Sequence, residues 1–235
     1  MTFLSIVIPA YNERDRLPRT LELFLEYLSQ QTYSWELIIV DDGSMDDTLV
    51  AIAEQVQKVD ELALKIISQP QNRGKGAAVR TGVLASTGDR ILFSDADGST
   101  PITELAKLQT ELDQGADIAI GNRRDSAITV RQPLYRVIIG EGFNLLARLA
   151  LQSKIRDTQC GFKLLSGDLA REIFAQMQMT GFSFDVELLY LALKKGYQIK
   201  EVRVVWIDDK RSKVKIWRDP FLVLIDLLRI RQIHG

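Results

Sequence analysis

Cysteine and histidine are almost absent from this chain of 235 residues, which has only Cys160 and His234. A single cysteine has no partner for an intramolecular disulfide, and with one histidine it cannot build a zinc cluster. Because His234 is the penultimate residue, we do not expect a histidine base inside a buried cleft.

Long apolar runs and an excess of one charge are also missing. No segment reaches about 18 uncharged apolar residues, so no spanning helix is predicted. The first nine residues lack the basic start and apolar core of a signal peptide, and we expect a cytoplasmic protein. The 30 basic and 31 acidic side chains leave a net charge of −1, so no global field attracts nucleic acid. A hydrophobic content of 46% indicates a globular fold.

The first half of the sequence alternates between two hydrophobic patterns. Strands are predicted at Phe3–Ile8, Glu36–Val40, Ala63–Ser68, Arg90–Ser94 and Asp117–Ile120. Helices are predicted at Arg14–Ser29, Asp46–Gln57, Gly76–Ala85 and Ile102–Gln114. This alternation predicts an α/β fold, with a mostly parallel central sheet and helices on both faces.

The second half is less regular. It predicts a long apolar helix at 133–152, short strands at Phe162–Leu165 and Tyr197–Val205, and helices at Gly167–Gln176, Phe184–Lys194 and Pro220–Ile233. We find no linker or repeat, so residues 1–235 are expected to form one domain with halves at 1–122 and 123–235.

The most informative segment is Ile91–Asp97, an apolar run that ends in two carboxylates one residue apart. Aspartate disfavours strands, so Asp95 and Asp97 are expected where the strand emerges at the carboxyl edge of the sheet. Two hard oxygen ligands this close suit Mg²⁺ or Mn²⁺, which in turn holds a diphosphate. The alternative is an Asp-rich turn without a metal.

Three more polar segments follow the other early strands. They are Pro9–Glu13, Asp41–Ser44 and Asn72–Gly76, and the last two contain glycines where the backbone must approach something closely. Loops after successive parallel strands meet at one edge, so all three should line one crevice with Asp95 and Asp97.

In this order, the four segments resemble the family 2 glycosyltransferases, which have the nucleotide-sugar-binding fold called GT-A. The resemblance covers nearly the whole chain. It implies that the nucleotide sugar, through its nucleoside and phosphates, is bound by Pro9, Ala10, Tyr11, Glu13, Asp41, Lys75 and Asp95. It also implies that Asp95 and Asp97 bind the metal, so residues 1–122 are the donor half.

Later motifs narrow the resemblance. Arg156–Leu164 is similar to the signature of dolichyl-phosphate β-glucosyltransferases, and more loosely to polyprenyl-phosphate mannosyltransferases. It implies an acceptor site at Asp157 and Gln159, a base at Asp185, and phosphate-binding side chains at Arg123, Arg211 and Lys213. Ser99 stands where the mannosyltransferases usually have glutamine, which weakens the mannosyl interpretation.

The expected function is therefore inverting, metal-dependent transfer of a hexose, glucose first, from UDP-hexose to a polyprenyl or dolichyl phosphate. Divalent metal and basic side chains neutralise the leaving diphosphate in such a reaction. The alternatives are a GDP-mannose-dependent polyprenyl-phosphate mannosyltransferase and a family 2 transferase that acts on a sugar hydroxyl. A dinucleotide oxidoreductase is disfavoured, because G-x-G-x-x-G does not follow the first strand.

A polyprenyl acceptor requires contact with a membrane. The helix at Pro220–Ile233 is too short to cross a bilayer and carries basic residues near its end, a pattern typical of interfacial helices. We expect peripheral attachment to the cytoplasmic membrane face. The alternative is packing of this helix, and of 133–152, on the sheet or against a second copy of the chain in a homo-oligomer.

Overall fold

The computed structural model describes residues 2–56, 63–124, 155–207 and 219–235, together with isolated positions between 142 and 153. Its seven strands are β1 (Leu4–Ala10), β2 (Trp35–Asp41), β3 (Leu64–Ser68), β4 (Arg90–Ser94), β5 (Ile118–Asn122), β6 (Phe162–Ser166) and β7 (Ile199–Arg203). They form one sheet in the order β3-β2-β1-β4-β6-β5-β7. All neighbouring pairs are parallel except those that involve β6. The predicted α/β fold with a mostly parallel sheet is confirmed.

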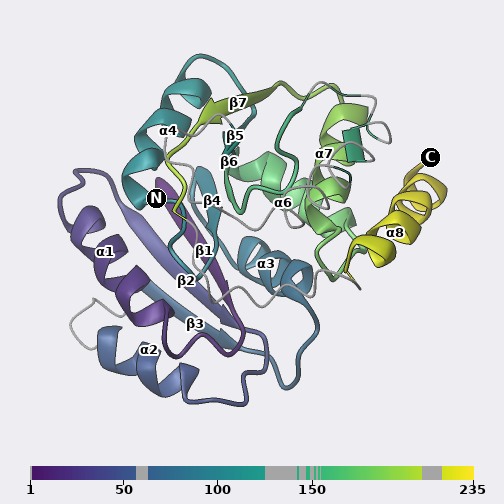
Figure 1. The fold of residues 1–235 in the computed structure, drawn as a ribbon. Helices are drawn as coiled ribbons and strands as arrows, with labels where there is room; N and C mark the ends of the chain where they lie inside the picture. Colours follow the sequence, from purple (N-terminus) through teal and green to yellow (C-terminus); the bar gives the residue numbers. More distant parts are fainter. Residues whose placement is uncertain are drawn as a thin grey trace.

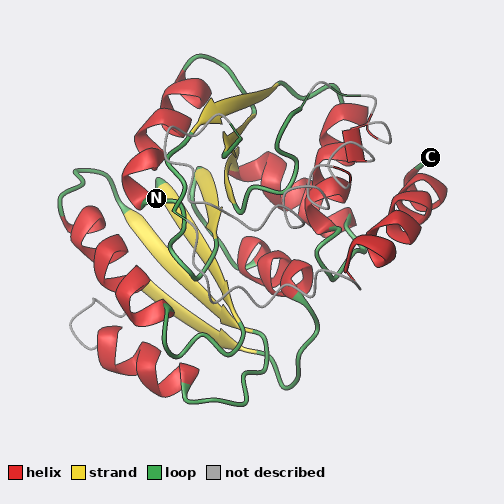
Figure 2. Cartoon of the chain, in the orientation of Figure 1, coloured by secondary structure: helices red, strands yellow, loops and turns green. Residues whose placement is uncertain are grey.

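Helices lie on both faces of this sheet (Figures 1 and 2). They are α1 (Leu17–Ser29), α2 (Thr48–Val56), α3 (Lys75–Leu84), α4 (Leu105–Asp113) after a short 3₁₀ turn at Ile102–Glu104, α6 (Gly167–Gln176), α7 (Phe184–Lys194) and α8 (Asp219–His234). The alternation of side chains along β4 separates the two layers. Arg90 reaches Asp113 of α4, whereas the ring of Phe93 packs on Phe174 of α6.

The core follows from the apolar strands. Every residue of β1 is buried, and Val7 and Ile8 are fully shielded from solvent. At Gly82 of α3 a Cβ atom would lie 2.4 Å from a methyl carbon of Val7, so glycine lets this helix approach the sheet closely. Phe93 is fully buried between Phe174 and Phe184, and burial of such a ring contributes about 1.5–3 kcal/mol.

Several element boundaries differ from those predicted. β1 continues through Pro9 and Ala10, which the sequence pattern placed in the following loop. Proline is tolerated there because β1 pairs with β4 only as far as Val7, which leaves one side of the strand without a neighbour at Pro9. The strand predicted at Tyr197–Val205 is shorter, and the helix predicted at 133–152 lies almost wholly outside the described residues.

Candidate active site

The described strands converge at one edge of the sheet. β1, β2, β3, β4, β5 and β7 all end there, since they run parallel to one another. β6 runs the opposite way and therefore begins there, so the turn at Cys160–Gly161 joins the same edge. The chain between β5 and β6 thus leaves from and returns to this edge. The prediction that the loops after the early strands lie at one edge of the sheet is confirmed.

The two carboxylates after β4 are paired with cations. Lys75 at the start of α3 has its Nζ 2.5 Å from Asp95 Oδ1, and Arg16 lies 3.7 Å from Asp97 Oδ2. The Ser99 N–H donates to Asp97 Oδ1 at 3.0 Å. Burial, and then the charge of Asp95, raises the pKa of Asp97 above its ordinary value. Burial alone would lower the pKa of Lys75, but the nearby aspartates, Asp95 foremost, raise it.

Gly161 fits directly against Asp95. Its carbonyl accepts the N–H of Asp95 at 3.1 Å, and a Cβ atom at Gly161 would lie only 2.1 Å from Asp95 Oδ2. Only glycine therefore leaves room for the carboxylate in its present position.

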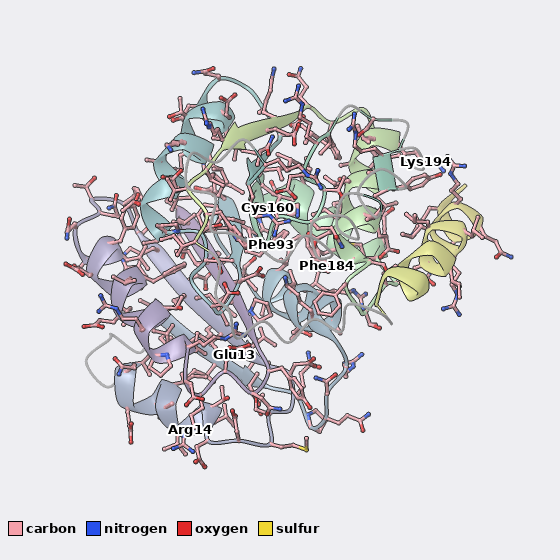
Figure 3. The ribbon with its side chains drawn as sticks, in the orientation of Figure 1. Glu13, Arg14, Phe93, Cys160, Phe184 and Lys194 are labelled. Carbon is pink, nitrogen blue, oxygen red and sulfur yellow. The ribbon has the colours of Figure 1, made fainter. Side chains whose placement is uncertain are left out.

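Asp185 lies in the first turn of α7, with 3% of its surface exposed. Its carboxylate forms an ion pair with Lys163 of β6, whose ammonium is fully buried. Burial, only partly opposed by Lys163 and Lys75, raises the pKa of Asp185. Figure 3 shows Phe93, Cys160 and Phe184 gathered in the middle of the molecule. The Lys163 ammonium lies 5.3 Å from the centroid of the Phe93 ring and donates to the Cys160 carbonyl. Burial also raises the pKa of the Cys160 thiol to about 12, so this thiol is no nucleophile.

Asp157 and Arg123 form a bidentate pair. The Arg123 Nε and Nη2 atoms each lie 2.8 Å from an oxygen of Asp157, and the backbone N–H of Arg123 donates to the same carboxylate at 3.0 Å. The Arg123 guanidinium also stands 5.8 Å from the ring centroid of Trp206. Despite burial, Arg123 holds the pKa of Asp157 at about 2. Asp157 therefore orients the arginine, and a narrow cleft between Asp95, Arg123, Gly161 and Trp206 opens beside it.

The first two loops are cross-linked by hydrogen bonds. Asn12, at a positive φ of 55°, donates its N–H to Ser44 Oγ at 2.8 Å and accepts the N–H of Met45 at 2.8 Å. Asp41 is buried and accepts from Ser44 and Ser68. Asn12 and Asp41 thus fix the conformation of the two loops that the resemblance assigns to the nucleoside.

A neighbouring carboxylate, Asp42, organises the third loop. It accepts the N–H groups of Arg73 and Gly74, both at 2.8 Å. Burial raises the pKa of Asp42, although these two N–H groups oppose the shift. Gly74, at a φ of 100°, turns the chain so that Lys75 starts α3 facing Asp95.

The remaining residues predicted for the site differ in burial and in their partners. Pro9 and Ala10 are buried at the end of β1, and Tyr11, the next residue, is half-buried. The Glu13 carboxylate accepts a hydrogen bond from Arg16 Nε at 2.6 Å. Gln159 is half-buried in the turn before β6. Arg211 and Lys213 lie outside the described residues.

A divalent metal fits the donor set at Asp95 and Asp97. Among the residues that the structure describes, no cluster of three or more His, Cys, Asp or Glu side chains could hold a metal by itself. Mg²⁺ commonly takes only one or two protein carboxylates together with substrate phosphates, so two aspartates suffice when a diphosphate is bound.

Lys163, Arg16, Asp42 and Trp206 are the site residues that sequence reasoning missed. Lys163 had a usable signal, because a lysine inside the apolar run Phe162–Leu165 has to find a carboxylate once the strand is buried. The other three give no such signal, since the site contacts of Arg16 with Asp97, of Asp42 with the third loop and of Trp206 with Arg123 join residues that are distant in sequence.

This arrangement of strands occurs in nucleotide-sugar enzymes of known structure. Glucosyl-3-phosphoglycerate synthase from Mycobacterium tuberculosis, crystallised with Mn²⁺, UDP and glucosyl-3-phosphoglycerate, superimposes with a TM-score of 0.74 over 97% of this chain and 80% of that one, at 19% identity. The same enzyme with Mg²⁺ and UDP gives a TM-score of 0.70. The protein therefore has the GT-A-type fold of nucleotide-sugar transferases.

Sequence comparison defines the family. The model of glycosyl transferase family 2 matches residues 5–174, and the chain belongs to this family. Dolichyl-phosphate β-glucosyltransferase of Mus musculus is 38% identical over 91% of this chain and 70% of its own length. The Saccharomyces cerevisiae enzyme of that name is 36% identical, over 99% of this chain and 75% of its own length. Both the family and the subfamily resemblance predicted from the motifs are confirmed.

Proposed function

We propose that this protein transfers glucose from UDP-glucose to a polyprenyl phosphate of the dolichyl type, with inversion at the anomeric carbon. The observation that carries the proposal is the similarity to enzymes named dolichyl-phosphate β-glucosyltransferase, which extends over 91–99% of this chain at 36–38% identity in mouse, fly and yeast. UDP-glucose is an α-glycoside, so a β-glucosyl product requires a single displacement. UDP and a divalent metal also occur together in structures with this fold.

In the proposed reaction, an oxygen of the acceptor phosphate attacks C1 of glucose. The bond between C1 and the UDP oxygen breaks, and UDP departs with the electron pair. Asp95 and Asp97 would hold Mg²⁺ or Mn²⁺, and the ion would supply positive charge against the departing diphosphate. Lys75 is paired with Asp95, and Arg123 lines the cleft next to it. Both cations are suited to bind phosphate oxygens of donor and acceptor.

The ion pair between Asp185 and Lys163 supports a phosphate acceptor rather than a sugar hydroxyl. A hydroxyl is a poor nucleophile and needs a base, whereas a phosphate monoester has its second pKa near 6 and is largely dianionic at pH 7. Asp185 is buried and its carboxylate is already engaged by Lys163. We therefore assign it to orienting neighbouring groups, which suffices for a dianionic acceptor because such an acceptor needs no base.

Helix α8 is the candidate membrane contact. No helix in the described part of the chain is long and apolar enough to span a bilayer. α8 is held against α7, because the Ser183 hydroxyl donates to Asp226 at 2.6 Å and His234 lies 2.7 Å from Glu187. Its outer side carries Ile225, Leu228 and Ile233, of which Leu228 is 69% exposed, and the arginines Arg229 and Arg231. This combination suits the surface of an anionic bilayer.

Donor and acceptor screening tests the proposal. The purified chain is incubated with radiolabelled UDP-glucose, UDP-galactose or GDP-mannose, with Mn²⁺ or EDTA, and with polyprenyl phosphate in vesicles, 3-phosphoglycerate or a free disaccharide. We expect label in the organic phase only with UDP-glucose, polyprenyl phosphate and metal. Preference for GDP-mannose, or transfer to the disaccharide or to 3-phosphoglycerate instead of the lipid, would contradict the proposal.

A further inference from the structure

The one fully buried lysine among the described residues is Lys163, in the middle of the site. It lies opposite Phe93 in the β4–β6 register, and its Nζ is 5.3 Å from the centroid of that ring. The ammonium donates to the Cys160 carbonyl at 2.6 Å and forms the ion pair with Asp185. Taking an ammonium out of water costs several kcal/mol, so a lysine kept here must be compensated by these two partners.

Other charges around Asp185 come from two more elements. The Nζ of Lys75 on α3 lies 5.9 Å from the ring centroid of Phe184, the residue before Asp185, and is paired with Asp95 after β4. The charges of Lys75 and Asp95 both influence the pKa of Asp185. Four groups therefore form a series of alternating charge from β6 to the end of β4, namely the Lys163 ammonium, the Asp185 carboxylate, the Lys75 ammonium and the Asp95 carboxylate. The negative charge of Asp185 is shared by two lysines, only one of which belongs to the donor site.

We propose that Lys163 is a positioning residue for glucose transfer, which acts by holding Asp185 ionised in one orientation so that Asp185 in turn fixes Lys75 beside Asp95. This role rests on the proposed function. In the absence of Lys163, Asp185 is a buried carboxyl group whose nearest cation is already engaged by another aspartate. Such a group takes up a proton, and Lys75 then loses one of the two charges that hold it.

A purely structural role makes a different prediction. If Lys163 served only the fold, its removal would lower the melting temperature and leave the pH profile of the folded enzyme unchanged. If it acts through Asp185, its removal introduces a new titration, since carboxyl groups buried without a partner ionise only at a pKa of about 8–9 in documented proteins.

The experiment compares Lys163→Met, Asp185→Asn and the double variant in the full chain. Rates of glucose transfer from UDP-glucose to polyprenyl phosphate in vesicles are measured from pH 6 to pH 9, with melting temperatures alongside. The matched control is Lys65→Met, because Lys65 also pairs a carboxylate, Glu36 at 2.7 Å, and a backbone carbonyl, that of Ala85 at 3.1 Å. That pair lies near the amino ends of β2 and β3, away from the site.

We expect kcat of Lys163→Met at pH 6 to fall to that of Asp185→Asn, and at pH 9 to recover to within about 3-fold of the unsubstituted enzyme. The double variant should match Asp185→Asn within about 3-fold at every pH, because Lys163 has no further role once the carboxylate is gone. Lys65→Met should keep the unsubstituted pH profile, whatever it loses in stability.

Two results overturn the inference. One is a Lys163→Met profile parallel to that of the unsubstituted enzyme, and the other is a double variant more than about 10-fold slower than Asp185→Asn. If Lys163→Met does not fold, the second comparison still decides, because both of its members lack the unpaired carboxylate. Failure of the proposed function has a separate sign, namely no glucose transfer by the unsubstituted chain.

Discussion

Replacement of Gly161 by alanine should disable the site and leave the fold in place. The new Cβ atom would lie 2.1 Å from Asp95 Oδ2 and 2.3 Å from Asp95 Cγ, whereas ordinary contacts of a Cβ atom are 3.4–4 Å. The turn cannot retreat freely, because the Gly161 carbonyl accepts the N–H of Asp95. The carboxylate itself must therefore move by more than about 1 Å.

The magnitude follows from that displacement. A misplacement of about 1 Å in a reacting constellation costs about 10²-fold in rate, which corresponds to about 2.7 kcal/mol of transition-state stabilisation. Because Gly161 is not among the glycines at positive φ, alanine imposes no left-handed backbone. The side chain that has to move lies at a strand end, so we expect only a small fall in melting temperature.

Three measurements on the Gly161→Ala variant test this reasoning: kcat with UDP-glucose, Mn²⁺ affinity by calorimetry in the presence of UDP, and melting temperature. Gly181→Ala is the matched control, since its Cβ atom meets nothing within 4 Å and its φ is not positive. We expect about 10²-fold loss of kcat and weaker Mn²⁺ binding in Gly161→Ala alone. The reasoning is refuted if Gly161→Ala keeps kcat and Mn²⁺ affinity within about 3-fold of the unsubstituted protein.

Three further outcomes are expected. Asp97→Ala should abolish glucose transfer and the Mn²⁺-dependent part of UDP-glucose binding without unfolding the chain; full activity of the unsubstituted enzyme in EDTA would exclude the metal role. Asp157→Asn should lose about 2 kcal/mol of stability at pH 7, because the folded pKa of about 2 lies below the ordinary 3.8. That contribution is present above about pH 4 and is lost as the pH falls towards 2. The free energies of unfolding of the two proteins, measured by chemical denaturation, should therefore differ less at pH 2.5 than at pH 7. An equal difference at both pH values would contradict the prediction. Leu228→Asp should weaken binding to anionic vesicles about 10-fold at unchanged melting temperature, because the residue is exposed on α8. Val50→Asp on α2, also exposed, is its control, and equal loss in both variants would place the membrane contact elsewhere.

The sheet and the carboxylates were predictable because their signals are local. Apolar runs that alternate with helical spacing specify strands and helices without knowledge of any partner. The end of β4 was marked by Asp95 itself, since aspartate interrupts an apolar strand. The reversed direction of β6 was not predictable, because a strand of five residues reads the same in either direction and its pairing depends on neighbours far away in sequence.

The pairing of charges was also beyond the sequence. Asp157 reads as a substrate ligand in the motif, but the fold brings Arg123 to it across 34 positions. The motif alone suggests that Asp185 is a base. Its carboxylate, however, is paired with Lys163, which lies 22 positions away on another element. Which acidic group is free and which is neutralised is a property of tertiary contacts, whereas the sequence reports only that acids are present.

The reversed strand has a topological consequence for how such enzymes diversify. Because β5 ends and β6 begins at the same edge, residues 123–161 form an excursion that starts and finishes beside the reacting groups, with Arg123 at one end and Gly161 at the other. Strand order and register do not depend on the length of that excursion. Under the proposed function, we therefore expect that changes of sequence between these two residues can alter the choice of acceptor while the order and register of the described strands are kept.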